Sequence, residues 1–316
     1  MENTAPRIGY YRTTSLQYIS YDFRLFHIEN NNIEAVMGDF TLLLDGLIFS
    51  EGPRWKDGKL WFSDMHDQKI FTVDLDGNKQ LIHAADDDTS GLGFTSDGSL
   101  LYVSMQKRKL MRVENGVATT VADLSSLVPF HCNDMIVDAQ DRCYVGNFGF
   151  DLHGGAEQVS TDLLMIEKDG SVSVAASDLL FPNGTVITPD GKTMIVAETF
   201  GARLTAFDIA DNGSLSNRRV WADTSPSVPD GICLDAEGAV WVASPSTRDV
   251  IRVKEGGEIT HRLKPSTNVF ACMLGGEDRK TLFALTADES SPHVLQGRRT
   301  GKIEMTRVEV PGAGLP

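Results

Sequence analysis

One short phrase recurs along this chain, and two of its copies are nearly the same. Residues 182–197 read Pro-Asn-Gly-Thr-Val-Ile-Thr-Pro-Asp-Gly-Lys-Thr-Met-Ile-Val-Ala, and residues 229–243 read Pro-Asp-Gly-Ile-Cys-Leu-Asp-Ala-Glu-Gly-Ala-Val-Trp-Val-Ala. In each copy an Asn or Asp follows a proline and precedes an apolar run, an acidic turn and a second apolar run. An acidic residue before glycine, between apolar runs, is a strong hairpin signal. The phrase therefore predicts a strand, a tight turn and a returning strand.

Turns of this kind occur at about residues 57, 97, 140, 190, 237 and 278, so the repeat is 40–50 residues long. A period of this size, with three or four strands in each repeat, is typical of propeller blades. Six copies predict an all-β fold, a six-bladed β-propeller that forms a single domain over residues 1–316. Residues 1–40 fit the repeat poorly. We expect them to be an N-terminal extension or a closing strand, with the alternating segment 303–310 in the last blade. The alternative is a β-sandwich with chance turns.

The composition limits which binding partners and which cellular compartment we expect. The formal net charge of −15 argues against nucleic acid and anionic membrane surfaces as partners. The four cysteines show no metal-binding spacing, and three of them lie in or beside apolar runs. We therefore expect buried thiols in a reducing compartment. The chain has no secretory signal pattern and no membrane-spanning run, which favours the cytoplasm. Nothing in the composition indicates an oligomeric state.

The first polar residue of each repeat varies while the rest of the phrase is kept. The innermost strands of a propeller run beside its axis, so equivalent residues should form a ring at one end of the channel. Aligned on the turns, these residues are Glu51, Ser90 or Gly91, Asn133, Asn183, Asp230 and Ala271. Two carboxylates and two amides favour a hard cation such as Ca²⁺ or Mg²⁺ over Zn²⁺ or Cu²⁺. Taken singly, each residue is also ordinary turn chemistry, and a cation that only plugs the channel is another alternative.

Four motifs in this order resemble the senescence marker protein / gluconolactonase / luciferin-regenerating enzyme family, to which regucalcin belongs. They are the phrase at 51–55, Asn133-Asp134, Pro182-Asn183-Gly184 and Pro229-Asp230-Gly231, and the resemblance runs from about residue 45 to about residue 290. It implies a six-bladed propeller with one divalent cation held by Glu51, Asn183 and Asp230. Calcium is the preferred ion, with Mg²⁺, Mn²⁺ or Zn²⁺ as alternatives. The resemblance also implies that Asp230 is the general base and that Asn133 lies at the substrate.

One position departs from the pattern of the sugar lactonases in this family. They carry an arginine two residues before the substrate asparagine, where this chain has His131. An imidazole titrates near neutrality, so His131 is a candidate second acid or base as well as a substrate contact, with a structural role as the alternative. Phe148, Phe150 and Asp151 are further candidates for substrate binding. The aromatic character of this segment favours a lactone or ester less polar than a sugar lactone.

The predicted function is metal-dependent opening of a lactone or ester ring in a small molecule. The cation would polarise the carbonyl while Asp230 assists the attack of water, with Asn133 and His131 as the other catalytic candidates. No Gly-x-Ser-x-Gly motif supports a serine hydrolase. Two alternatives stay open. One is a calcium-binding regulatory propeller without turnover, and the other is a hydrolase of organophosphate esters.

Overall fold

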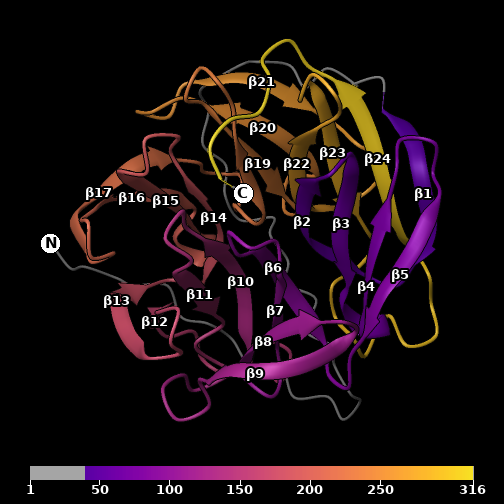
Figure 1. Cartoon of the computed structure of the whole chain (residues 1–316). Coiled ribbons are helices and arrows are strands. Elements are labelled where there is room, and N and C mark those ends of the chain that lie inside the picture. The colour runs from indigo at the N-terminus through magenta and orange to yellow at the C-terminus, as the bar shows by residue number, and fades with distance from the viewer. Residues whose placement is uncertain (1–39, 316) are drawn as a thin grey trace, which may run out of the picture.

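Each repeat of the sequence forms one four-stranded antiparallel sheet. The computed structural model describes residues 40–315, and within them 24 strands form six such sheets around a central axis (Figure 1). The predicted six-bladed propeller is thereby confirmed. The only helical segments among these residues are two 3-10 turns, η1 (Met65–Asp67) and η2 (Thr199–Gly201). None of the described helices is long and apolar enough to cross a bilayer. The cytoplasmic location stays a prediction.

The first three blades follow the chain order from the axis outward. Blade one consists of β2 (Ser50–Lys56), β3 (Lys59–Asp64), β4 (Lys69–Val73) and β5 (Lys79–Ala84). Blade two consists of β6 (Thr89–Phe94), β7 (Leu100–Ser104), β8 (Lys109–Glu114) and β9 (Val117–Asp123). Blade three consists of β10 (Cys132–Val137), β11 (Cys143–Asn147), β12 (Thr161–Ile166) and β13 (Val172–Leu179).

The remaining blades complete the ring. Blade four consists of β14 (Pro182–Ile187), β15 (Thr193–Glu198), β16 (Arg203–Ile209) and β17 (Leu215–Asp223). Blade five consists of β18 (Ile232–Leu234), β19 (Val240–Ser244), β20 (Asp249–Val253) and β21 (Ile259–Leu263). Blade six consists of β22 (Val269–Gly275), β23 (Thr281–Thr286), β24 (Gly301–Arg307) and β1 (Thr41–Leu47). The six inner strands contact one another in sequence order around the axis.

The ring closes by pairing the start of the described chain with its end. Strand β1 runs antiparallel to β24, with Thr41 opposite Met305, and so supplies the outermost strand of blade six (Figure 1). A closed ring leaves fewer strand edges open to pairing with other chains. The segment 303–310 was expected in the last blade, and its residues up to Arg307 lie in β24. Residues 1–39 lie outside the described residues, so the N-terminal extension and the single domain over 1–316 stay predictions.

The six predicted turns join the inner strand of each blade to the next strand. In blade one Asp57 and Gly58 both have positive φ angles, 52° and 74°, between the paired residues Lys56 and Lys59. This is the two-residue hairpin whose twist matches that of the strands. In blades three and six the left-handed position lacks glycine, and Asp141 and Arg279 adopt it with φ angles of 66° and 56°. All four cysteines are free and buried, as predicted.

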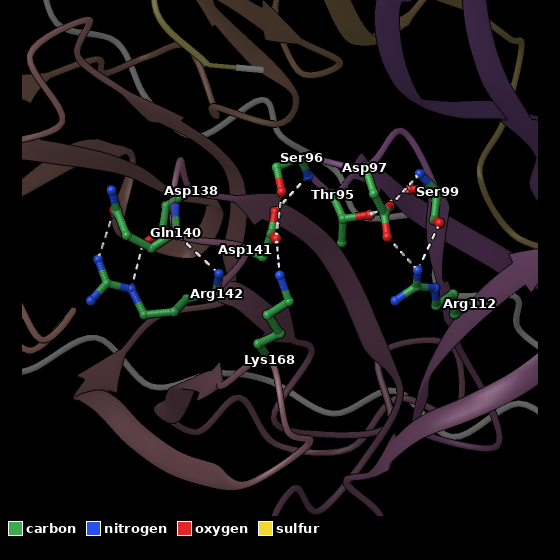
Figure 2. Close-up of polar contacts among 10 residues, drawn as sticks. All are labelled: Thr95, Ser96, Asp97, Ser99, Arg112, Asp138, Gln140, Asp141, Arg142 and Lys168. Carbon is green, nitrogen blue, oxygen red and sulfur yellow. Dashed lines mark hydrogen bonds and ion pairs between the residues drawn. The ribbon is translucent and has the colours of Figure 1, made fainter.

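Asp141 also joins two blades at this turn end of the propeller. Its side chain accepts hydrogen bonds from the Ser96 backbone N–H (2.6 Å), the Ser96 hydroxyl (2.8 Å) and Lys168 Nζ (2.9 Å). Figure 2 shows the carboxylate between Ser96, on the turn of blade two, and Lys168. The hydrogen bond from Lys168 lowers the pKa of Asp141. The contact therefore holds the turns of blades two and three together.

We expect Asp141→Asn to lower the free energy of unfolding by about 1–3 kcal/mol, because the amide cannot accept all three hydrogen bonds. Asparagine tolerates the left-handed backbone, so the loss would report on the side chain. Urea unfolding measures it. The matched control is Asp190→Asn, since Asp190 accepts bonds only from Thr188 and Lys192 of its own turn.

The lowered pKa of Asp141 also determines how the stability difference between wild type and Asp141→Asn changes with pH. A lowered carboxyl pKa stabilises the fold above the unfolded value, near 3.8 for Asp141, and that contribution disappears as the pH falls through the folded value. The difference between wild type and Asp141→Asn should therefore narrow as the pH falls from about 7 towards about 3. A difference that stays constant over this range would contradict the role of the carboxylate.

Candidate active site

The ring consists of one residue from each blade. Each of these residues has an equivalent place in the pairing between the first two strands of its blade. In blade one Asp64, the last residue of β3, pairs with Ser50, and the next residue is Glu51. In β6, β10, β14 and β22 the ring member is likewise the residue that follows the partner of the last residue of the blade's second strand. In blade five Asp230 precedes β18, and its N–H donates to the Ala243 carbonyl (3.0 Å). The ring therefore consists of Glu51, Ser90, Asn133, Asn183, Asp230 and Phe270.

Blade six corrects the alignment made from the sequence. Ala271 was expected in the ring, but Val269 pairs with Thr286 and Ala271 pairs with Leu285, which leaves Phe270 between them in a bulge. The same one-residue bulge occurs at this point in blades one to four, so the misalignment comes from the turn. Five residues separate the paired Gly275 and Thr281 in blade six, whereas four separate Thr188 and Thr193, which are hydrogen-bonded in blade four. The ring position of blade six is therefore aromatic. In blade two the same rule selects Ser90 over Gly91.

Polar side chains at the ends of the second strands hold the chain where it enters the ring. Asp64 accepts the N–H groups of Ile48 (3.0 Å) and Phe49 (2.9 Å), just before Glu51. Glu198 accepts the N–H of Leu180 (2.9 Å), just before Asn183. Ser244 does the same for Val228 (3.0 Å), just before Asp230. These bonds satisfy backbone donors that no strand partner reaches, so they fix the entry to the ring in three blades.

The glycine after a ring residue allows the inner strands to pack closely. A side chain on Gly184 would meet the backbone oxygen of Asp230 at 2.6 Å, and one on Gly231 would meet Ala271 at 2.7 Å. The sequence pattern Asn-Gly or Asp-Gly is also turn chemistry, but here each glycine lies where the next inner strand passes. These contacts set the spacing between neighbouring ring members.

The ring side chains contact one another in two pairs. Asn183 Nδ2 donates to Asp230 Oδ1 (2.5 Å) and lies 3.1 Å from Thr199 Oγ1. Ser90 Oγ donates to Asn133 Oδ1 (3.2 Å). The structure thus joins Asn183 directly to Asp230, while Asn133 is joined to Ser90, which the sequence did not select as a ligand. No hydrogen bond from the described residues engages Asp230 Oδ2.

Three partly buried carboxylates, of Glu51, Asp134 and Asp230, and the buried guanidinium of Arg54 determine the charge of the channel. Burial raises the pKa of Glu51 well above its usual value, and the nearby charges of Asp230 and Asp134 raise it further. Burial also raises the pKa of Asp230, to about 8. Arg54 pairs with Asp134 (3.2 Å) and donates to the Met135 carbonyl (2.5 Å). When all four groups are ionised they carry a net charge of −2.

This charge and these atoms fit a divalent cation. Within residues 40–315 no cluster of three or more His, Cys, Asp and Glu side chains is placed to hold a metal, so a ligand set here must include amide oxygens. Glu51, Asn183 and Asp230 provide two carboxylates and one amide, which are hard donors suited to Ca²⁺ or Mg²⁺. A divalent cation would also balance the net charge of the buried groups.

The predicted substrate contacts lie at the same end of the propeller. His131 stacks on Phe130 with ring centroids 4.0 Å apart, and its backbone oxygen accepts the N–H of Phe148. Burial lowers the pKa of His131. Phe148 and Phe150 are buried, whereas Asp151 is exposed. Asp151 accepts the N–H of Gly154 (2.7 Å) and so stabilises its own loop.

A second concave feature lies at the opposite end of the channel. A cleft of about 560 Å³ is lined by Trp55, Asp74, Leu75, Asp76, Glu277 and Arg279 among others. Its residues come from turns of blades one and six. Asp74 accepts hydrogen bonds from Asp76 and Asn78 within its own turn. We therefore place the chemistry at the ring, where the carboxylates with raised pKa values lie, and not in this cleft.

Comparison with known proteins identifies the family. The sequence profile described as "SMP-30/Gluconolactonase/LRE-like region" matches residues 49–288. Pentonolactonase XacC of Haloferax volcanii is 26% identical over 251 residues, 74% of this chain and 82% of the relative. Regucalcin of Danio rerio is 25% identical over 252 residues, 75% of this chain and 82% of the relative.

A solved structure gives the same result for the fold. The calcium-binding protein regucalcin of Agrobacterium tumefaciens superposes with a TM-score of 0.76 at 23% identity, over 89% of this chain and 98% of that one. At this identity the likeness shows the fold alone. The profile match covers most of the chain, and all six ring positions lie within it. The chain therefore belongs to the SMP-30/gluconolactonase/LRE-like family.

Proposed function

We propose that this protein is a lactonase, a carboxylic ester hydrolase that opens the lactone ring of a small molecule with the help of one divalent cation. The observation that carries the proposal is the pair of carboxylates, Glu51 and Asp230, beside Asn183 in a channel whose charged groups sum to −2 when all are ionised. Family membership and the pentonolactonase among its relatives support the reaction class. Calcium is the proposed ion because the ligands are oxygen atoms and regucalcin of Agrobacterium tumefaciens is a calcium-binding protein.

The residues of the site would have different roles in hydrolysis. Glu51, Asn183 and Asp230 would hold the cation. A bound divalent cation would polarise the lactone carbonyl, stabilise the charge that develops on its oxygen and offset the repulsion between the carboxylates. Asp230 Oδ2 lacks a hydrogen-bond partner among the described residues, so it can accept the proton of the attacking water.

Two neighbours would complete the site. The Asn133 side chain, held by Ser90, would orient the substrate through its amide nitrogen. His131 would donate a proton to the alkoxide that leaves when the ring opens. Phe148 and Phe150 would pack against the substrate, with Asp151 at the edge of the site. The product is the hydroxy acid. The proton accepted by Asp230 would pass to solvent, and His131 would take up a proton from solvent to replace the one it donated.

Removal of divalent cations is the direct test. We expect hydrolysis of δ-valerolactone to fall by at least about 100-fold after EDTA treatment and dialysis, because carbonyl polarisation by a metal contributes several kcal/mol. Adding Ca²⁺ or Mg²⁺ back should restore it. Hydrolysis that survives EDTA would refute the role of the metal. Tight Ca²⁺ binding by calorimetry with no hydrolysis of any lactone would instead support a regulatory propeller without turnover.

A further inference from the structure

Seven of the chain's 15 phenylalanines gather at the ring end of the channel. Each lies in the segment that leads into an inner strand, at the start of that strand, or just after a second strand, so all of them lie at the end where the ring forms. They belong to one apolar cluster. We call this set the aromatic collar, and it consists of Phe49, Phe130, Phe148, Phe150, Phe181, Phe200 and Phe270.

The collar forms two runs of touching rings. In blades three and four Phe148 lies 4.5 Å from Phe181, which lies 5.2 Å from Phe200. Phe200 continues to Phe150 (5.6 Å). On the other side, Phe270 of the ring meets Phe49 of blade one at 4.8 Å. These spacings are those of favourable aromatic pairs, so the collar is an ordered apolar cluster with members from four blades.

Blade five interrupts the collar with hydroxyl groups. Ser244 and Ser246 lie 3.1 Å apart and both approach the Val228 N–H, while Thr247 donates to Ser244 (2.8 Å). These residues lie beside the entry to Asp230. The ring end is therefore polar in blade five, next to the candidate base, and also between blades one and two, where His66 lies 3.0 Å from Asp88. The collar makes the parts contributed by blades three, four and six largely apolar.

We infer that the substrate is a lactone or ester with an apolar body, an aromatic ring or an alkyl chain, whose carbonyl faces Asp230 while its body packs on the aromatic collar. The inference rests on the proposed function and adds the substrate class to it. Sugar lactones carry several hydroxyls, and each one placed against phenylalanine would lose its hydrogen bonds to water without replacement. Apolar groups gain free energy when the same surface leaves water.

A substrate can contact the half-buried members of the collar without displacing other side chains of the core. Phe130 and Phe200 keep part of their surface exposed, whereas the other five are buried. Phe130 also supports His131, because the two rings stack. Phe94 is a matched control, since it is a half-buried phenylalanine at the opposite end of an inner strand, against Trp61.

The first experiment compares six-membered lactones that differ in the body, with each kcat/KM divided by the rate constant for hydrolysis of that lactone by hydroxide, because the phenol of dihydrocoumarin leaves more readily than an alkoxide. We expect kcat/KM to rise from δ-valerolactone to δ-undecalactone and dihydrocoumarin by about 10-fold or more, since each extra buried methylene can contribute several-fold. Glucono-1,5-lactone should be the poorest of the four. A gluconolactone rate equal to or above that of the apolar lactones would overturn the inference and leave the lactonase proposal intact.

The second experiment separates the collar from a general loss of stability. Phe200→Ala should lower kcat/KM for dihydrocoumarin by about 10- to 100-fold and leave that for δ-valerolactone within about threefold. Phe94→Ala should change neither. Equal effects of Phe200→Ala on both lactones would overturn the inference. If no lactone is hydrolysed, the proposed function fails. Calorimetry with 3-(2-hydroxyphenyl)propanoate against gluconate then tests the collar alone, and preference for gluconate would refute it.

Discussion

Replacing Asp230 with asparagine is expected to lower kcat for lactone hydrolysis by about 10³-fold, because the site would lose its proton acceptor and a positioned base contributes about 10²–10⁴. Asparagine keeps the shape of the side chain and one oxygen ligand. KM should therefore change much less than kcat. Stopped-flow measurement with a pH indicator, at saturating Ca²⁺, gives both constants.

Two further variants make this result specific. Asp230→Ala removes the ligand as well as the base, so calorimetry should show Ca²⁺ affinity falling by at least about 10-fold more than in Asp230→Asn. Asp190→Asn is the matched control, since Asp190 lies on the turn at the far end of blade four, and its kcat should equal that of wild type. Near wild-type kcat in Asp230→Asn would assign the base to another group.

The propeller scaffold could be predicted because its signals, the turns and the apolar runs, lie close together in the sequence and occur in every repeat. Each turn needs a left-handed residue, and the apolar runs on either side have strand lengths, so one blade explains the next. Glu51, Asn133, Asn183 and Asp230 were found by comparing repeats, and all four occupy equivalent ring positions. The roles assigned to them stay predictions. Comparison of repeats could not supply the length of each turn, and the longer turn between Gly275 and Thr281 is why Ala271 was predicted in place of Phe270.

The remaining parts of the site depend on contacts between blades. Arg54 and Asp134 lie 80 residues apart in the sequence and form an ion pair across two inner strands. Ser90 supports Asn133 from the neighbouring blade. The aromatic collar gathers residues from four blades, of which the sequence suggested only Phe148 and Phe150. Some of the other collar residues could have been found by comparing, between repeats, the positions just before each inner strand and just after each second strand.

The stability of the metal-free protein provides a test of the channel charges that does not depend on catalysis. The pKa values of Glu51 and Asp230 are raised by burial, and that of Glu51 is raised further by the carboxylates nearby. A raised carboxyl pKa stabilises the fold at low pH, and this contribution is lost as the pH rises from the unfolded value towards the folded one. For Asp230 that window extends from 3.8 to about 8.

We therefore expect Glu51→Gln to stabilise the metal-free protein, by about 1–3 kcal/mol near pH 8 and much less near pH 4, because it removes one of the like charges. Urea unfolding in EDTA at a series of pH values measures the difference from wild type. The difference reports Glu51 together with the change that its charge causes in the titration of the neighbouring Asp230. Glu255→Gln, at an exposed position in blade five, should show no such trend.

Calcium should reverse the order of the two proteins. The cation binds the ionised carboxylates, so it stabilises wild type by an amount that grows with pH as fewer protons compete for the site. Glu51→Gln has lost a ligand and should gain less. Wild type is thus expected to be the less stable protein in EDTA and the more stable one at saturating Ca²⁺. If Glu51→Gln were the more stable protein under both conditions, Glu51 would be a buried acid without a cation to bind, and the charge balance proposed for the channel would be wrong.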